Sequence, residues 1–337
     1  MTVYAGKAGA VVRKFGFDKS DLVPYYFRDE ESGVGFPILR QFSERKEDNS
    51  SFPEDGYCMP EVQDVRCYQE TGYVIARGLF GAEEVQSYQE HFMQMRAAGT
   101  YPGDFAGVDL QSSDPLKRFP RMIHMHRWDD VSLRWMLEKR LNDWMTDLLG
   151  VEPYAVQTMF YFKPAGGRGQ ALHQDQYYLK VHPGTCIAAW MALDDCDQEN
   201  GCLQVVPTTH ELPILCTVQA DTSQSFTDVT VPIPEGMHPE PVLMQAGDVL
   251  FFNGQLVHGS FPNTSENRFR RSLIGHYIVG EAEQVAKFYQ PVLRMDGTPV
   301  AMGISEGGSE CGVWVHEESG PVVAMRAMGG PVADVSE

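Results

Sequence analysis

The fold assignment depends on the stretch Gly247-Asp248-Val249-Leu250-Phe251-Phe252-Asn253-Gly254-Gln255-Leu256-Val257-His258-Gly259-Ser260. Its four consecutive apolar residues lie between Gly-Asp on one side and Asn-Gly on the other, which predicts a short buried strand between turns. His258 follows a few residues later. The stretch therefore predicts a β-structure in which a histidine lies just past the end of a buried strand.

Short apolar and aromatic runs of the same kind recur on both sides of this stretch. Separated by Gly, Pro, Asn or Asp, they predict strands over residues 73–76, 155–162, 186–193, 203–207, 229–233, 248–252 and 270–279. Helical spacing predicts one helix over residues 81–98 and a second over 131–149, with Gly150 as its C-terminal cap. The chain is therefore expected to be mainly β, a barrel or sandwich with flanking helices.

Composition divides the chain into three parts. Residues 1–64 lack a sustained period and are expected to form an irregular N-terminal extension, and residues 301–337 a loosely held tail. Residues 65–300 are expected to form a single domain. Within it, the polar segment 212–241 is rich in Pro, Thr and Ser, and a connection of that length inside a domain is often a functional lid.

Charge and cysteine content limit the classes of partner. With 27 Lys and Arg against 46 Asp and Glu, the formal charge of the 337 residues is −19, which disfavours nucleic acid and anionic membrane surfaces. No apolar run reaches the length of a signal peptide or membrane span, so a cytoplasmic location is expected. Seven cysteines without a C-x-x-C pair are interpreted as free thiols. A homodimer is left open.

A metal site is predicted by His173 and Asp175. In an extended strand, residues two apart point to the same face, so this imidazole and carboxylate could hold one ion. His258, beyond a distant strand, would complete two nitrogens and one oxygen on one side of the metal. That ligand set, with the remaining positions open, suits non-haem Fe(II).

A basic cluster, Arg268-Phe269-Arg270-Arg271, leads into the predicted strand 270–279. If Arg270 begins that strand, its side chain shares an interior face with Ile274 and His276, where a guanidinium needs a carboxylate partner. A dicarboxylic co-substrate would supply one, and the Ser260 hydroxyl could donate to the same group. His276 is expected to lie in the core or behind the metal. We expect His124 and His126 to be packing residues, and a role in lining a substrate pocket is the alternative.

Several motifs occur in an order that resembles the phytanoyl-CoA dioxygenase family of Fe(II)- and 2-oxoglutarate-dependent oxygenases. They are His173-Gln174-Asp175, Trp190-Met191-Ala192-Leu193-Asp194-Asp195, Asn200-Gly201-Cys202-Leu203, Pro207-Thr208-Thr209-His210, His258-Gly259-Ser260 and Phe269-Arg270, with Gln157-Thr158-Met159 and Lys163-Pro164 also fitting. The resemblance covers roughly residues 65–279. It implies a double-stranded β-helix, the jelly-roll core shared with cupins.

The resemblance also implies roles for individual residues. By position, His173, Asp175 and His258 bind iron, while Arg270 and Ser260 bind the distal carboxylate of 2-oxoglutarate. The resemblance further implies that Met159 and Gln174 border the co-substrate pocket and that Trp190 packs behind the metal. The loop after His258 is one residue longer than in the family pattern, so Arg268 competes with Arg270.

The expected function is that of a 2-oxoglutarate-dependent non-haem iron dioxygenase. It would use O2 to hydroxylate an unactivated C–H bond of a small metabolite or natural product, releasing succinate and CO2. Asp175 argues against halogenation, because related halogenases lack this carboxylate. Desaturation, epoxidation, rearrangement and acyl-CoA hydroxylation remain alternatives with the same cofactors. A cupin-type metal enzyme or binding barrel that does not use 2-oxoglutarate is a further alternative, which an interior Arg270 disfavours.

Overall fold

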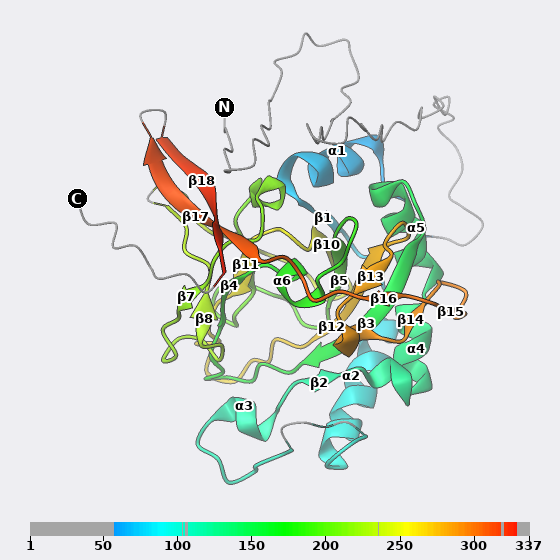
Figure 1. The fold of residues 1–337 in the computed structure, drawn as a ribbon. Coiled ribbons are helices and arrows are strands. Elements are labelled where there is room, and N and C mark those ends of the chain that lie inside the picture. Colours follow the sequence, from blue (N-terminus) through cyan, green and yellow to red (C-terminus); the bar gives the residue numbers. More distant parts are fainter. Residues whose placement is uncertain (1–56, 103, 105–106, 235, 318–319, 329–337) are drawn as a thin grey trace.

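The computed structural model describes residues 57–102, 104, 107–234, 236–317 and 320–328. Most of the expected N-terminal extension and the last nine residues of the expected tail lie outside the described residues. Two antiparallel sheets form the centre of the fold, and helices cover the outer face of the larger one (Figure 1). The molecule is mainly β with a jelly-roll core, as predicted.

The larger sheet contains eight strands. Its order is β1 (Tyr73–Ala76), β10 (Val249–Asn253), β5 (Cys186–Ala192), β12 (Ser272–Val279), β3 (Pro153–Tyr161), β14 (Val292–Leu293) and β15 (Pro299–Val300), with β2 (Met122–Ile123) also paired to β3. The smaller sheet has the order β4 (Gln170–His173), β11 (His258–Ser260), β6 (Leu203–Val205) and β9 (Glu240–Val242). In the smaller sheet, strands β4 and β11, far apart in the sequence, are neighbours.

The core has one layer on each face of the larger sheet. On the outer face, Met191 of β5 packs with Phe251 of β10 and with residues of the helices. On the inner face, Trp190 of β5 packs with Leu250 of β10 and with Val205 of the smaller sheet. Every residue of β5 is buried, since both of its faces are covered. This double burial explains why β5 and β10 are continuous apolar runs and not alternating ones.

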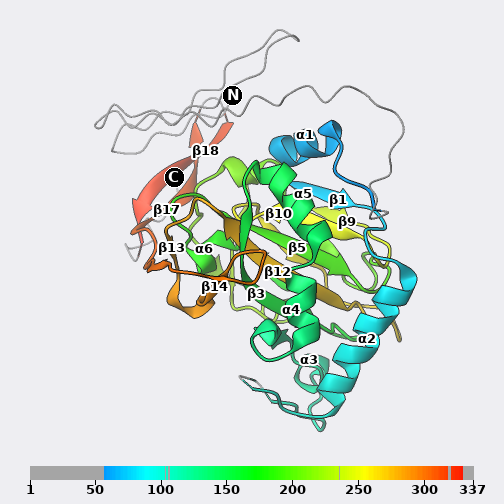
Figure 2. The same cartoon turned by 90° about the vertical axis from the view of Figure 1, so that its right-hand side faces the viewer.

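Helices line the outer side of the larger sheet (Figure 2). They are α1 (Val62–Thr71), α2 (Ala82–Ala97), α4 (Asp130–Met136) and α5 (Lys139–Leu149). Two short helices lie elsewhere: α3 (Pro115–Arg118) next to the loop at Gly166 and Gly167, and α6 (Gln176–Leu179) after β4. The single helix predicted over residues 131–149 is wrong, because the chain breaks between α4 and α5. The Glu138 side chain accepts from the backbone N–H of Arg140 and starts α5, while the apolar spacing continues because both helices bury residues in one core. Gly150 ends α5 in the left-handed conformation, as predicted.

The remaining elements lie outside the two main sheets. They are β7 (Val218–Gln219) paired with β8 (Val229–Thr230), β13 (Gln284–Val285) paired with β16 (Gly303–Ile304), the hairpin β17 (Glu310–Glu317) and β18 (Gly320–Ala327), and the 3₁₀ turns Met125–Arg127, Thr209–Glu211 and Lys287–Tyr289. The strand predicted over residues 270–279 begins at Ser272. The strand expected to hold both His173 and Asp175 ends at His173 as β4, and β11, where His258 was expected to lie past a strand, was not predicted.

The interpretation of all seven cysteines as free thiols is wrong, because Cys216 and Cys311 form a disulfide. It joins the predicted lid segment 212–241 to β17 of the predicted tail, and the backbone N–H of Cys216 also donates to the carbonyl of Gly312 (2.8 Å). The same lid segment also contacts the smaller sheet, because the N–H of Val231 donates to the carbonyl of Leu172 in β4 (2.7 Å). The two cysteines are 95 residues apart, so no local spacing could have predicted their pairing.

Within the described ranges, the helices are all too short or too polar to cross a lipid bilayer.

Asp248 joins the loop after β1 to the turn before β10. Its buried carboxylate accepts from the N–H of Gly78 (2.7 Å), the N–H of Gln245 (2.9 Å) and the Arg77 guanidinium (2.7 Å). We expect Asp248→Ala to lower the free energy of unfolding by about 2–4 kcal/mol, because two backbone donors lose their acceptor. Urea denaturation measures this, with exposed Asp228→Ala as the control. Equal stability of the two variants would contradict the assignment.

Candidate metal centre

His173 and His258 lie opposite each other on neighbouring strands of the smaller sheet. His173 ends β4, His258 begins β11, and the two are paired in register, with ring centroids 4.2 Å apart. The expectation that Asp175 continues the strand is wrong, because Asp175 has helical backbone angles and immediately precedes α6. The turn nevertheless returns its carboxylate to within 3.4 Å of His173 Nε2 and 3.7 Å of His258 Nε2.

Backbone carbonyls fix which ring nitrogen of each histidine faces the site. His173 Nδ1 lies 2.9 Å from the carbonyl of Ala171, and His258 Nδ1 lies 3.0 Å from that of Leu256. A carbonyl only accepts, so each Nδ1 carries the hydrogen and each Nε2 presents a lone pair to Asp175. Metal-binding histidines in proteins are oriented in this way.

The charge states of the cluster also suit a metal. Burial, together with the neighbouring His173, lowers the pKa of His258 to about 4, so this imidazole is neutral at neutral pH. Burial alone would raise the pKa of Asp175, but the neighbouring His258, His276 and His173, with the hydrogen bond from His276, hold it well below its usual range. The site thus offers two imidazole nitrogens and one carboxylate.

The three donor atoms lie within 4.8 Å of one another, and all three residues are buried. Two histidines and one carboxylate on a single side of a metal are the ligand set of non-haem Fe(II) oxygenases. His276 Nε2 lies 3.1 Å from Asp175 and holds the carboxylate from behind, as predicted for this imidazole. The Gln170 amide lies 3.0 Å from His173 Nε2, in the place where a metal would approach. These residues fit an iron ion.

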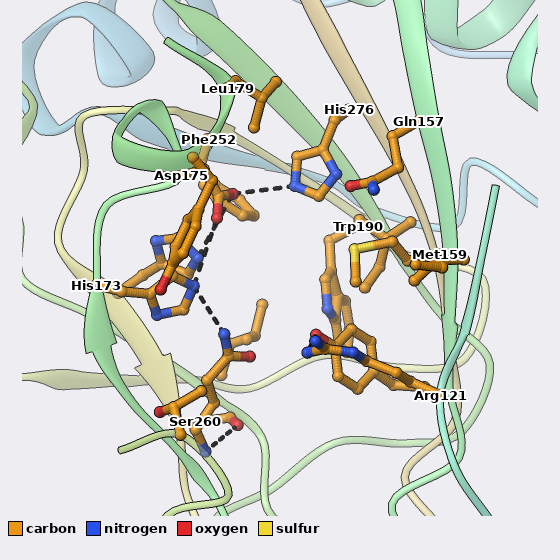
Figure 3. Close-up of a pocket in the computed structure, with 18 of the residues that line it drawn as sticks. Arg121, Gln157, Met159, His173, Asp175, Leu179, Trp190, Phe252, Ser260 and His276 are labelled. Atoms are coloured by element: carbon orange, nitrogen blue, oxygen red, sulfur yellow. Dashed lines mark hydrogen bonds and ion pairs between the residues drawn. The ribbon is translucent and has the colours of Figure 1, made fainter. Parts of the chain in front are cut away.

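The cluster opens into a pocket of about 420 Å³ between the two sheets. Figure 3 shows His173, Asp175 and Ser260 on one side of it and Trp190, Met159 and Arg121 on the other. The residues that line it are Arg121, Ile123, Gln157, Met159, Tyr161, Gln170, His173, Asp175, Tyr178, Leu179, Trp190, Leu203, Thr227, Phe252, His258, Ser260, Arg270, Ile274, His276, Phe288 and Tyr289.

Arg270 is buried in the wall of this pocket, and Arg268 is not part of it. The Arg270 guanidinium donates to the carbonyl of Gly201 (3.1 Å) and to Ser272 Oγ (3.0 Å), and it lies over the Trp190 ring. In the described part of the chain it has no carboxylate partner. Arg268 is half-exposed and forms ion pairs with Asp197 and Glu199. Of the two arginines, only Arg270 can contact a ligand in the pocket.

Ser260 is held so that its hydroxyl can only donate to a ligand. Its Oγ accepts from Lys163 Nζ (2.7 Å) and from the backbone N–H of Gln170 (3.1 Å). Lys163 is buried and also donates to the carbonyls of Gly201 and Phe261. No role was predicted for Lys163 from the sequence, although a single cation directly after the aromatic run 160–162 was a signal for one.

A side chain at Gly201 would disturb this arrangement. Its φ is +85°, and a Cβ there would lie 2.7 Å from the carbonyl oxygen of Phe261 and 2.8 Å from Lys163. The Gly201 carbonyl accepts from both Lys163 and Arg270. Glycine at this position therefore lets one backbone oxygen hold two buried cations.

Met159 and Gln174 were predicted to border the co-substrate and Trp190 to pack behind the metal, and the structure separates them into two groups. Met159 and Trp190 line the pocket. Gln174 does not, because its side chain is buried behind the site, where it donates to the carbonyls of Pro213 and Gln255 and accepts from the N–H of Leu215. Gln174 thus connects the turn that follows β4 to the predicted lid segment 212–241.

The histidines of the 3₁₀ turn lie beside the pocket without lining it. His126 Nδ1 lies 2.9 Å from Thr158 Oγ1, and His124 Nε2 lies 3.4 Å from the Gln157 amide. Burial, with Arg127 nearby, lowers the pKa of His126 to about 4. The packing role predicted for this pair agrees with their burial, whereas Arg121, three residues earlier, reaches the pocket and was not predicted.

We expect His258→Ala to weaken Fe(II) binding by more than about 100-fold, since losing even an outer partner of a ligand typically costs 10–100-fold. Anaerobic equilibrium dialysis against Fe(II) measures this. His238→Ala removes an exposed histidine and is expected to bind like the wild type. Unchanged affinity in His258→Ala would rule out this cluster as the iron site.

The buried neutral His126 makes stability depend on pH. Its pKa is lower in the folded chain than in the unfolded chain, so the unfolded state takes up the proton first as the pH falls. The stabilisation is complete above about pH 6.5 and is lost by about pH 4, a difference of roughly 3 kcal/mol. Urea denaturation across this range should show a shallower pH dependence for His126→Gln. An identical pH dependence in both proteins would contradict the assignment.

Comparison with known proteins agrees with this geometry. Residues 68–272 match the family model described as "Phytanoyl-CoA dioxygenase (PhyH)". "Phytanoyl-CoA dioxygenase 1" of Oryza sativa subsp. japonica is 28% identical over 142 residues, which are 42% of this chain and 50% of the rice protein. The match thus spans only half the length of that relative.

The fold is also found in solved structures. A non-haem α-ketoglutarate-dependent carbocyclase, SnoK from nogalamycin biosynthesis, superposes with a TM-score of 0.56 at 19% identity, over 73% of this chain and 96% of SnoK. The epimerase SnoN, solved with Fe3+, α-ketoglutarate and nogalamycin RO, gives a TM-score of 0.52 at 19% identity, over 78% and 97%. The family match covers more than half of the chain, and the protein therefore belongs to the phytanoyl-CoA dioxygenase family of non-haem iron, 2-oxoglutarate-dependent oxygenases.

Proposed function

We propose that this protein is an Fe(II)- and 2-oxoglutarate-dependent dioxygenase that hydroxylates an unactivated C–H bond of a small metabolite or natural product, with release of succinate and CO2. The observation that carries the proposal is one pocket lined both by His173, Asp175 and His258 and by the buried, carboxylate-free Arg270. A cupin-type enzyme that does not bind a dicarboxylate has no need of such an arginine. Iron and 2-oxoglutarate, when bound, would supply the oxidising chemistry.

The chain's own residues position the reactants. His173, His258 and Asp175 would hold the metal, and the pocket beside them would receive the co-substrate and O2. At the other end of the pocket, Arg270 would bind the distal carboxylate through its remaining N–H groups, and Ser260 would donate its hydroxyl hydrogen. Both contacts are charge-assisted and buried, conditions in which such hydrogen bonds are strong.

Apolar side chains complete the site. Phe252 packs against His258, with ring centroids 4.5 Å apart, and Leu203 and Ile274 line the same wall. Such a wall excludes bulk water from the metal and strengthens the electrostatic interactions within the pocket. We assign Met159 and Trp190 to the same surface, bordering the co-substrate.

Halogenation is not proposed, because Asp175 fills the position that a halide would need. Desaturation, epoxidation, rearrangement and acyl-CoA hydroxylation use the same residues and differ only in the substrate bound. A cytoplasmic location and a possible homodimer also remain part of the proposal. The Cys216–Cys311 disulfide is an observation against the cytoplasmic location, since disulfides are rare in the reducing cytosol.

An anaerobic titration with Fe(II) and 2-oxoglutarate tests the function. We expect a visible charge-transfer band from the chelated keto acid in the wild type. In Arg270→Ala the dissociation constant for 2-oxoglutarate should rise by about 30-fold or more, because losing one partner of a buried charge pair costs about 2–5 kcal/mol. Arg268→Ala is the matched control and should leave the constant unchanged, since Arg268 pairs outside the pocket.

Two outcomes would contradict the proposal. Absence of the band in wild-type protein that binds Fe(II) would remove the oxygenase assignment. A larger effect of Arg268→Ala than of Arg270→Ala would move the co-substrate site out of this pocket.

A further inference from the structure

The pocket keeps a positive charge that the proposed cofactors do not neutralise. Its charged lining residues are Asp175, Arg121 and Arg270. The two positive charges of Fe(II) and the two negative charges of 2-oxoglutarate cancel. The side chains that remain are two arginines and one aspartate, so the pocket has a net positive charge. A protonated histidine in the pocket would only add to this excess. The chain as a whole has a formal charge of −19, so its overall composition does not explain a positively charged pocket.

Arg121 is the cation that this balance leaves without a negative partner. Its Nη1 donates to the Tyr161 hydroxyl (3.0 Å), and its guanidinium lies over the rings of Tyr161 (5.8 Å) and Phe226 (5.6 Å). Across the described ranges it forms no ion pair, whereas Arg96, Arg140, Arg268 and Arg271 each do. Two aromatic faces hold the guanidinium plane while most of its N–H donors stay available.

The position of Arg121 separates it from the co-substrate groups. It lies across the pocket from His173 and Ser260 (Figure 3), between Pro120 and strand β2. Its side chain is exposed, whereas Arg270 is buried at the far wall. Arg121 therefore lies at the mouth of the pocket, together with the exposed Tyr178 and Phe288.

The surfaces near Arg121 are aromatic. Tyr161, Tyr178, Phe288 and Tyr289 line the pocket together with Ile123. The total volume of about 420 Å³ lies near the lower end of the range for small-molecule sites, about 300–1,000 Å³, and the co-substrate takes part of it. The remaining space suits a compact molecule with an apolar body.

We propose that the substrate is a small monocarboxylate whose anionic group binds Arg121 at the pocket mouth, with its apolar body between the aromatic side chains and the metal. This inference rests on the proposed function and deepens it by naming the substrate class. Arg121 determines specificity because a neutral analogue would lack the charge-assisted hydrogen bonds that a carboxylate makes with the guanidinium, and the carboxylate fixes which carbon of the substrate faces the metal.

The test compares acids with their uncharged counterparts. Protein loaded anaerobically with Fe(II) and 2-oxoglutarate is dialysed to equilibrium against benzoate, phenylacetate or hydrocinnamate, each paired with its primary amide. We expect at least one acid to bind about tenfold or more tightly than its amide, and Arg121→Gln to abolish the difference. Arg121→Lys should keep part of it. Arg118→Gln removes an exposed charge close in sequence and should behave as the wild type.

The outcomes separate this inference from the function on which it rests. Equal binding of every acid and amide, no binding of either series at millimolar concentration, or an acid preference that persists in Arg121→Gln would each overturn the inference. The 2-oxoglutarate charge-transfer band is recorded in the same samples. Its absence in the wild type would refute the proposed function, and a weakened band only in Arg121→Gln would make Arg121 a co-substrate ligand and likewise overturn the inference.

Discussion

The site depends on the pairing of two very short strands, β4 and β11, which places His173 directly opposite His258. Each imidazole then donates Nδ1–H to a carbonyl two residues earlier in its own chain segment, so local backbone geometry fixes both tautomers. The turn after β4 adds Asp175, which His276 of the larger sheet holds from behind. The metal ligands are therefore oriented before any metal arrives, and few degrees of freedom need to be lost when it binds.

A second constraint lies at the opposite wall, where Lys163 and Arg270 are buried beside one another. Burial lowers the pKa of both, and Arg270 adds to the effect on Lys163. Two buried cations that share the Gly201 carbonyl are costly without an anion nearby. A bound dicarboxylate would offset that cost, which is the physical reason to connect this wall with 2-oxoglutarate. The pocket then has a metal at one end and a carboxylate site at the other.

The sequence predicted most of the architecture because the apolar runs of β3, β5, β10 and β12 are long and bounded by turn residues. The metal ligands and Arg270 could be predicted from motif order, and strand parity correctly grouped Arg270 with Ile274 and His276 in the pocket wall. Other features depend on three-dimensional contacts with no local signal. The break before Glu138, the Cys216–Cys311 pair and the approach of Arg121 arise only when distant segments pack together.

The most direct measurement is a crystal structure of the protein grown anaerobically with Fe(II) and 2-oxoglutarate. The account predicts iron bonded to His173 Nε2, His258 Nε2 and an Asp175 oxygen. It also predicts the distal carboxylate of 2-oxoglutarate within hydrogen-bonding distance of Arg270 and Ser260 Oγ, with Arg121 still facing open pocket. Iron bound by other side chains, or a distal carboxylate held by Arg121 in place of Arg270, would contradict it.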